Sequence, residues 1–436
     1  MRKILIGLTI AGLLLMTLSI QPATAQSLPP LPPNCGFTSD PGSNSLVCYP
    51  GPGKDWIVFA HGYVPVGAPA GSAWLQLVLP NSTMTIPELV LGLGYGFAAS
   101  AYHKDGLAIE AGIADTVHLA QYLISALGAN RVYLVGASEG SLITTLIVED
   151  NGVFMSELSN PFAGGVALCG PIGDFRKQLN YFGDFRVLFD YFFPSLLPGN
   201  AINVPPELTF DWLQGLLDPY ESVYQSAVIA AVSNPANLKK VDQLMKTSKA
   251  AYVPGDLTTI LTTTLDVLRY DVVGMQDAIN VIGLQPYSNL TTYYYGSNND
   301  RKLNKRVDRF EGDPGIDLAL APYQTTGELT VPLVTMHTTL DQQVPAWHQT
   351  LYRVKVWSSG SALFYNGIPI SRYGHCNFTP EEMVFAFYLM VLKSTGVAFT
   401  FDQVATSLPD AESMEGFIEL QKQDPSLPEF LPRDSR

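Results

Sequence analysis

The chain has 436 residues, a formal net charge of −14 and only 15% charged residues. An acidic balance argues against nucleic acid and anionic membrane surfaces as partners, because both repel negative charge. The length exceeds one ordinary hydrophobic core, so we expect either one large domain with an insertion or two domains.

Residues 1–25 are predicted to be a cleaved signal peptide. Arg2 and Lys3 form a basic start, residues 4–20 are apolar, and Ala23-Thr-Ala25 is a small-residue cleavage site. Cleavage between Ala25 and Gln26 would take the formal charge from −14 to −16, because two cations leave. The mature chain would be secreted or periplasmic, with no membrane span. An uncleaved membrane anchor is the alternative, because the apolar run approaches the length of a span.

The cysteine count suggests disulfides, because an even number of cysteines in an exported chain favours oxidation. The four cysteines are Cys35, Cys48, Cys169 and Cys376, which allow three pairings. Cys35 and Cys48 flank a loop rich in Pro, Gly and Ser and would pair locally, worth about 3 kcal/mol on a chain-entropy estimate. That pairing leaves Cys169 with Cys376. Four free thiols are the alternative.

The next part of the chain predicts an α/β core that begins after an irregular leader. The leader is residues 26–54, which are rich in Pro, Gly and Ser. Strands are predicted at residues 56–60, 96–102, 132–135 and 165–169. A helix at residues 111–127 separates the second strand from the third, and another helix follows the third. This alternation, over residues 55–170, predicts a parallel sheet covered on both faces.

The alternation stops at residue 171, and residues 171–327 are predicted to be a mostly helical insertion. Its first part, residues 181–193, is dense in aromatic side chains. The core pattern resumes over residues 328–400, with further strands and a last core helix. Residues 401–436 are polar and punctuated by prolines, and we expect a loosely packed C-terminal tail.

One short motif carries the chemistry. The sequence Gly136-Ala-Ser-Glu-Gly140 follows a β-branched strand and precedes an apolar run. A serine in this position lies on a sharp strand-to-helix turn, and the glycines avoid collisions as the backbone doubles back. Glu139 opens the helix, so its N–H is unpaired and points where negative charge can be held. Ser138 is therefore a candidate nucleophile. A strand-helix turn without chemistry is the alternative.

A serine nucleophile needs a base, and histidine is the side chain suited to that role. His375 is the candidate because it stands in a Gly-flanked loop after the last strand and after a suitable acid. The remaining histidines are His61, His103, His118, His337 and His348.

The base in turn needs a carboxylate that fixes its tautomer. Asp341 is the candidate, because it ends a strand on the side of a parallel sheet where sites form. The alternative for Asp341 is an N-cap before the helix near Pro345. Asp300, Asp308 and Asp317 are the runners-up.

The chain order Ser138, Asp341, His375 resembles that of the α/β-hydrolase superfamily, whose order is nucleophile, acid, histidine. The further matching pieces are His61-Gly62 after the first apolar strand, Val344-Pro345 after the acid, and Gly374 before the histidine. The resemblance covers residues 55–170 and 328–395. It implies the α/β-hydrolase fold, with a mostly parallel sheet flanked by helices. In position, residues 171–327 resemble the cap or lid domains of this superfamily.

The resemblance also implies an oxyanion hole. Its donors would be the backbone N–H groups of Tyr63 and Glu139, each worth about 3 kcal/mol. The Glu139 side chain is expected to be solvated or paired, and not catalytic. A bridge between Cys169 and Cys376 resembles the active-site disulfides of some secreted esterases, although Ala137 stands where those enzymes carry a cysteine.

These patterns predict an exported serine hydrolase that cleaves a carboxylic ester, either small or polymeric. A serine peptidase of the prolyl-peptidase type is the alternative, since chain order alone does not separate the two. A non-catalytic binding relative is a third interpretation. The sequence has no metal-ligand or phosphate-loop pattern, so we expect no cofactor and no metal.

Overall fold

The computed structural model describes residues 31–38, 44–51, 54–79, 82, 84–150, 152–217, 221–423 and 427. The predicted signal peptide, residues 1–25, lies outside the described residues. Within these ranges, no helix combines the length and the apolar character that crossing a membrane requires.

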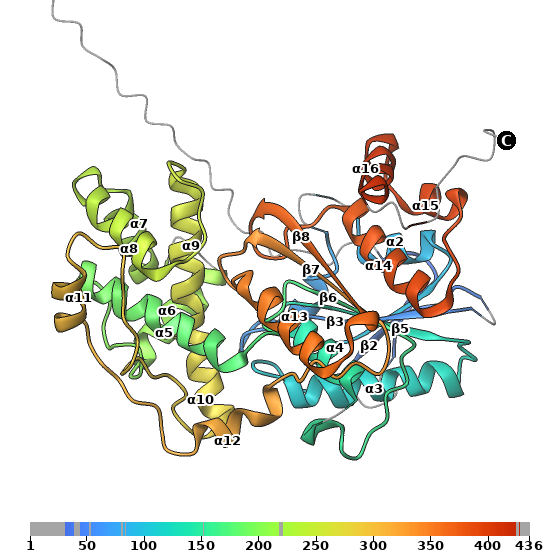
Figure 1. Ribbon diagram of the computed structural model, residues 1–436, viewed down its shortest axis with the longest axis horizontal. Helices are drawn as coiled ribbons and strands as arrows, with labels where there is room; N and C mark the ends of the chain where they lie inside the picture. The colour runs from blue at the N-terminus through green and yellow to red at the C-terminus, as the bar shows by residue number, and fades with distance from the viewer. Residues whose placement is uncertain are drawn as a thin grey trace, which may run out of the picture.

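A single sheet of eight strands organises the larger part of the molecule (Figure 1). The strands are β1 (Cys35–Thr38), β2 (Ser45–Cys48), β3 (Trp56–Ala60), β4 (Gly96–Ser100), β5 (Val132–Ala137), β6 (Gly165–Leu168), β7 (Leu333–Leu340) and β8 (Tyr365–Tyr373). Their order is β1-β2-β4-β3-β5-β6-β7-β8, and the pairs from β4 to β8 are parallel. This is the strand order of the α/β-hydrolase fold, so the predicted fold is confirmed.

Helices cover both faces of the sheet, which explains why all five residues of β3 are buried. One face carries α2 (Ile86–Gly92), α14 (Pro380–Thr395), α15 (Phe401–Ser407) and α16 (Ala411–Lys422). The other face carries α3 (Ile109–Ser125), α4 (Glu139–Glu149) and α13 (Trp347–Ser359). Short helical turns are α1 (Ser72–Leu75), η1 (Val153–Met155), η2 (Pro235–Asn237), η4 (Ala321–Tyr323) and η5 (Ala362–Phe364).

Between β6 and β7 the chain leaves the sheet and forms a group of helices at its side, which we call the cap (green to orange in Figure 1). The cap helices are α5 (Phe175–Phe192), α6 (Pro206–Leu217), α7 (Val223–Ser233), α8 (Leu238–Ser248), α9 (Leu257–Arg269), α10 (Gln276–Ile282), α11 (Asp300–Arg306) and α12 (Ile316–Leu320). A π-helical turn, η3 (Tyr270–Met275), joins α9 to α10. The buried Arg186 of α5 pairs with Asp190 and with Asp271, which ties α5 to this turn.

The prediction of an irregular leader at residues 26–54 is wrong for its described part. β1 and β2 form an antiparallel hairpin that the Cys35–Cys48 disulfide joins, and β2 pairs with β4 at the sheet edge. Leu46 and Cys48 are fully buried. Each strand has only four residues between Pro- and Gly-rich stretches, so neither shows the longer alternation that reveals a strand.

The prediction of a loosely packed tail is wrong for residues 401–423, which form α15 and α16. The Asp410 side chain accepts a hydrogen bond from Ser413 N and so caps α16. Phe417 is fully buried, with its ring 5.9 Å from that of Phe385 and 5.8 Å from that of Tyr388. A few apolar anchors on otherwise polar helices hold this segment against α14.

Candidate active site

Ser138 lies at the turn between β5 and α4, in a strained backbone conformation. Its φ is 55° and its ψ is −119°, a left-handed region that non-glycine residues seldom occupy. A Cβ on Gly136 would overlap the carbonyl group of Gly140, and a Cβ on Gly140 would overlap the carbonyl group of Ala60. Glycine is therefore needed at both positions for the turn to close, and the turn presents the Ser138 hydroxyl at the carboxyl edge of the sheet.

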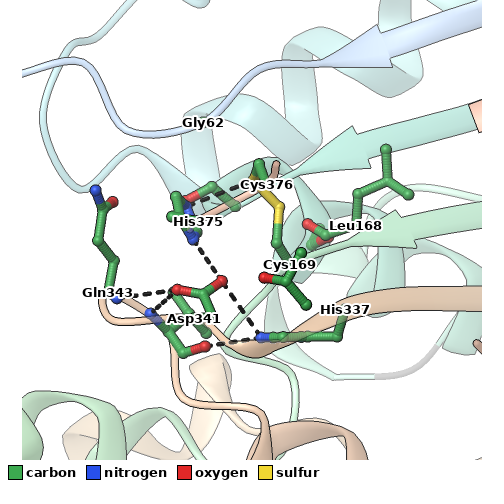
Figure 2. Close-up of a disulfide and its surroundings, with 12 residues drawn as sticks. Gly62, Leu168, Cys169, His337, Asp341, Gln343, His375 and Cys376 are labelled. Carbon is green, nitrogen blue, oxygen red and sulfur yellow. Dashed lines mark hydrogen bonds and ion pairs between the residues drawn. A yellow bond between two sulfur atoms is a disulfide. The ribbon is translucent and has the colours of Figure 1, made fainter. Parts of the chain in front are cut away.

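The structure brings the three predicted residues together. The Nε2 of His375 lies 2.9 Å from the Oγ of Ser138. Its Nδ1 lies 2.8 Å from Oδ2 of Asp341 (Figure 2). Oδ1 of Asp341 accepts hydrogen bonds from Gln343 N and Val344 N, each at 2.9 Å. Asp341 is 1% exposed. A buried carboxylate with these partners holds the imidazole in one orientation.

His337, on β7, also contacts the acid. Its Nε2 lies 2.7 Å from the carbonyl oxygen of Val344 and 3.5 Å from Oδ2 of Asp341 (Figure 2). Burial lowers the pKa of His337, so the ring is neutral and its single Nε2 proton bonds the loop that follows Asp341. From the sequence, His337 was assigned to a strand, and its contact with Asp341 was not predicted. Its position four residues before the acid was the signal that could have identified it.

The other histidines, all of which the structure describes, have different surroundings. His348 is buried, and its Nδ1 accepts from Gly173 N at 2.9 Å. His61 is stacked on Tyr102, with ring centres 3.9 Å apart. His103 pairs with Asp115, and His118 is exposed on α3.

The runner-up acids lie away from His375. Asp300 accepts hydrogen bonds from Ser297 and Gly296 at the start of α11. Asp308 is exposed next to that helix, and Asp317 of α12 pairs with Arg176. Each therefore belongs to the cap, and Asp341 is the carboxylate at the histidine.

A disulfide joins Cys169, at the end of β6, to Cys376, next to the candidate base (Figure 2). The Sγ of Cys376 lies 3.5 Å from Nε2 of His375. Both cysteines have left-handed backbone conformations, with φ of 51° and 50°. Although Cys169, His375 and Cys376 offer ligand atoms within 4.8 Å of one another, the two sulfurs are bonded to each other and no thiolate is free for a metal.

The two predicted oxyanion donors flank Ser138. Neither Tyr63 N nor Glu139 N donates a hydrogen bond to any of the described residues, so both N–H groups are available to a bound molecule. Gln76 fixes the loop that carries Tyr63: its Oε1 accepts from Gly62 N at 2.7 Å, and its Nε2 donates to the carbonyls of Gly62 and Tyr63. Sequence reasoning missed Gln76, because the contact is between side chain and distant backbone and has no local signature.

The Glu139 side chain is paired but not solvated. It is 7% exposed, and its Oε1 accepts from Ala108 N at 2.6 Å. Burial, with a smaller contribution from Asp277, raises the pKa of Glu139 to about 8, while Ala108 N and Lys104 lower it. The carboxyl group is therefore mostly neutral at pH 7, and it places little negative charge beside the N–H of the same residue.

Two hollows meet at Ser138, and Tyr63 and the cap residue Tyr270 line both. The first lies under the cap and is mainly apolar, with Leu107, Phe175 and Phe182 in its wall. The second lies on the histidine side; its other lining residues include Gln76, Leu79, Ile86, His375, Phe378 and Met383. A molecule that reacts at Ser138 can therefore extend in two directions.

The cap also contacts the loop of the acid. Tyr181 OH donates to the carbonyl oxygen of Gln342 at 2.7 Å, and Gln178 Nε2 donates to that of Gln343 at 2.8 Å. The Nε2 atoms of Gln342 and Gln343 both donate to Asp266 of α9. The cap is thus joined to the core beside the candidate site.

No protein-family model and no curated protein matches the sequence. Among solved structures, the chain is similar to an acylaminoacyl peptidase of Pyrococcus horikoshii, with 10% identity and a TM-score of 0.37 over 82% of this chain and 40% of that one. It is similar to a Pyrococcus furiosus esterase, with 11% identity and a TM-score of 0.38 over 80% and 84% of the chains. It is also similar to Candida antarctica lipase A, with 14% identity and a TM-score of 0.41 over 89% and 85%. The chain spans less than half of the peptidase.

The chain's own strand order and its glycine-flanked turn at Ser138 identify the α/β-hydrolase fold.

Glu139→Gln should change how stability depends on pH. Because the folded-state pKa of Glu139 is raised from 4.5 to about 8, its favourable contribution is complete below pH 4.5 and is lost as pH rises towards 8. Glutamine keeps the acceptor for Ala108 N but does not titrate. We expect the melting temperature of the variant, relative to wild type, to rise between pH 5.5 and pH 8. Glu110→Gln, on the exposed start of α3, controls for the loss of one charge, and a difference that stays constant with pH would contradict the assignment.

Reduction of the Cys169–Cys376 bridge should impair the site before it melts the fold. The bridge holds the His375 loop against β6, and a misplacement of about 1 Å costs about a hundredfold in rate. We expect labelling of Ser138 by a fluorophosphonate to slow by that order in mild reductant, with circular dichroism unchanged. The double variant Cys35→Ser/Cys48→Ser should label at the wild-type rate. Full labelling of protein whose Cys376 is alkylated would reject the role of the bridge.

Proposed function

We propose that the protein is an exported serine hydrolase that cleaves carboxylic esters, with Ser138, His375 and Asp341 as its catalytic triad. The observation that carries this proposal is the continuous hydrogen-bonded chain from Asp341 through His375 to Ser138, with links of 2.8 and 2.9 Å. The strained turn at Ser138 supports the same role, because backbone strain concentrates at reacting residues. Two disulfides fit an oxidising compartment and so support export.

The geometry accounts for acylation. The Oγ of Ser138 attacks the ester carbonyl carbon while its proton passes to Nε2 of His375. Asp341 keeps the other ring proton on Nδ1 and stabilises the imidazolium that forms. The tetrahedral intermediate then collapses, and Nε2 delivers its proton to the leaving alcohol. Water, deprotonated by the same nitrogen, releases the acid and restores the Ser138 hydroxyl.

Charge develops on the former carbonyl oxygen, and two backbone donors are available for it. Tyr63 N and Glu139 N would each be worth about 3 kcal/mol if they point at the oxyanion. An ionised Glu139 side chain would oppose this charge. Its raised pKa, about 8, keeps the carboxyl group mostly neutral at pH 7 and therefore supports the oxyanion role of the adjacent amide.

The two hollows suggest how the ester is oriented. His375 must protonate the leaving group, so the alcohol part belongs in the hollow that His375 lines. The acyl part then enters the apolar hollow under the cap, between Leu107, Phe175 and Phe182. An uncharged apolar acyl group suits these walls, because burying a charge there without a partner is costly.

Ser138→Ala tests the nucleophile. Only a hydroxyl is removed, so the fold should persist while hydrolysis of p-nitrophenyl esters falls by at least about four orders of magnitude. A panel of esters and aminoacyl amides, with fluorophosphonate labelling in parallel, separates an esterase from a peptidase. More than a few per cent of wild-type turnover in the purified variant would exclude Ser138. Faster cleavage of the amides would favour a peptidase.

His375→Ala should lose a similar factor, and Asp341→Asn somewhat less, because the acid orients the base and does not transfer the proton. His118→Ala, on the exposed face of α3, is the matched histidine control and should be fully active.

Phe182 should set acyl preference. Its side chain lines the apolar hollow, and its ring is stacked on that of Tyr270 with the ring centres 5.1 Å apart. Phe185 of the same helix is instead fully buried in the cap. Phe182→Ala should raise the rate with long or branched acyl chains relative to acetate. Phe185→Ala should instead lower stability by about 3–5 kcal/mol. The comparison needs kcat/KM over an acyl series and a melting curve for each variant. Unchanged relative specificity in Phe182→Ala would contradict the acyl assignment.

A further inference from the structure

A carboxylate of the cap is inserted into the core next to the candidate oxyanion hole. Asp277, on α10, is 8% exposed, and its Oδ2 accepts a hydrogen bond from Leu107 N. Gly106 lies against the same carboxylate: a Cβ on Gly106 would overlap it, and Gly106 has a φ of +84°. The backbone at residues 106–107 is therefore shaped to receive this side chain.

The loop that receives Asp277 also holds the residue after Ser138. Ala108 N, the amide next to Leu107 N, donates to Oε1 of Glu139 at 2.6 Å. Two consecutive amides thus bind two carboxyl groups, one from the cap and one from the turn that carries the nucleophile. Lys104, in the same loop, is the cation that acts on both carboxyl groups.

Asp277 also reaches the other expected donor. Burial and the nearby Asp277 carboxylate raise the pKa of the Tyr63 hydroxyl. Val64, next to Tyr63, forms a β-bridge with Gly106, in which Gly106 N donates to Val64 O at 2.7 Å. Gln76 fixes the main chain of Tyr63 from the core side. Asp277 acts electrostatically on the Tyr63 side chain from the cap side, and its bond to Leu107 N holds the loop that pairs with Val64.

We propose that Asp277 is a positioning residue that aligns the two oxyanion donors, Tyr63 N and Glu139 N, when the cap is seated on the core. This inference rests on the proposed function of Ser138. Asp277 acts through the Tyr63 side chain and through the loop at Leu107. Gly274 of η3 and Ala278 of α10 line the acyl hollow, so this helical segment contributes both to the substrate wall and to the alignment of the donors.

The expected signature is a change in kcat with little change in KM. Oxyanion donors interact with charge that exists only in the transition state, so misaligning them spares substrate binding. A trifluoromethyl ketone bound to Ser138 carries such an oxyanion, and its affinity should fall with kcat. A residue that merely supports the fold would lower the amount of active enzyme and leave the KM and the inhibition constant of the remaining enzyme unchanged.

The experiment uses the full mature chain with Asp277→Asn, which keeps the shape of the side chain and removes its charge. We expect kcat for a p-nitrophenyl ester, per fluorophosphonate-titrated site, to fall about 10- to 100-fold, in the range of misplaced catalytic groups. KM should stay within about threefold, and the trifluoromethyl ketone should bind more weakly by the same factor as kcat.

Asp211→Asn is the matched control. Asp211 is also an 8% exposed cap carboxylate that accepts from a backbone amide, Val223 N, but its partners lie inside the cap. It should leave kcat and the ketone affinity within about threefold of wild type. If Asp211→Asn lost as much kcat and as much ketone affinity as Asp277→Asn, general instability of the cap would be the cause, and the proposal would be overturned.

Tyr63→Phe provides a second route if Asp277→Asn folds poorly. This change removes the Tyr63 hydroxyl, which belongs to the core, and should lower kcat by a factor of the same order as Asp277→Asn. The double variant should lose no more than the worse single variant, because both changes break one interaction. Two outcomes would overturn the role of Asp277. In one, the losses in kcat of the two single variants multiply in the double variant; in the other, either single variant has the wild-type kcat.

The test separates this inference from the proposed function. If Ser138→Ala abolishes ester hydrolysis while Asp277→Asn is fully active, only the positioning role is wrong. If Ser138→Ala retains activity, the proposed function and this inference are both wrong.

Discussion

The close contact of α4 with the ends of β3 and β5 is the constraint on which the site depends. Gly140 lies against the carbonyl groups of Ala60 and His61, and Gly136 lies against Gly140. One backbone approach therefore sets both the strained conformation of Ser138 and its distance from the loop that follows β3. Any side chain at either glycine would push the helix away and would separate Ser138 from Tyr63 in the same movement.

The strain at Ser138 is not isolated. Cys169 and Cys376 also have left-handed backbone conformations, and both adjoin the same edge of the sheet. Each such residue costs of order 1–3 kcal/mol unless its surroundings hold it. The covalent bond between Cys169 and Cys376 supplies such a constraint, and it links the end of β6 to the loop of His375. The three strained positions thus lie around one imidazole.

The sequence was sufficient where a residue's position depends on its neighbours in the chain. The glycine spacing around Ser138, and the position of His375 in a loop after the last strand, are local patterns. The parallel direction of the core strands followed from alternation alone. Asp277 is different, because it bonds an amide 170 residues away, and nothing around it in the sequence differs from an ordinary helical aspartate. Gln76 was missed for the same reason.

Amino-acid composition led to wrong predictions for the segments at both ends of the core. The strand at residues 45–48 is short and lies between stretches rich in Pro and Gly, yet its pairing with β4 buries Leu46. Residues 411–422 are polar on most of their surface, yet Phe417 anchors them. In both segments one or two buried side chains decide the structure, and the average polarity of the segment hides them.

The cap contacts the core through carboxylates on two sides of Ser138. Asp266 of α9 receives the side-chain amides of Gln342 and Gln343, in the loop that follows the acid. Asp277 of α10 accepts a hydrogen bond from Leu107 N, in the loop that pairs with Val64 beside Tyr63. Because α9, η3 and α10 form one continuous helical segment, a displacement of that segment would disturb the loop after Asp341 and the loop at residues 106–107 together. The position of the cap and the geometry around Ser138 are then coupled through these two loops.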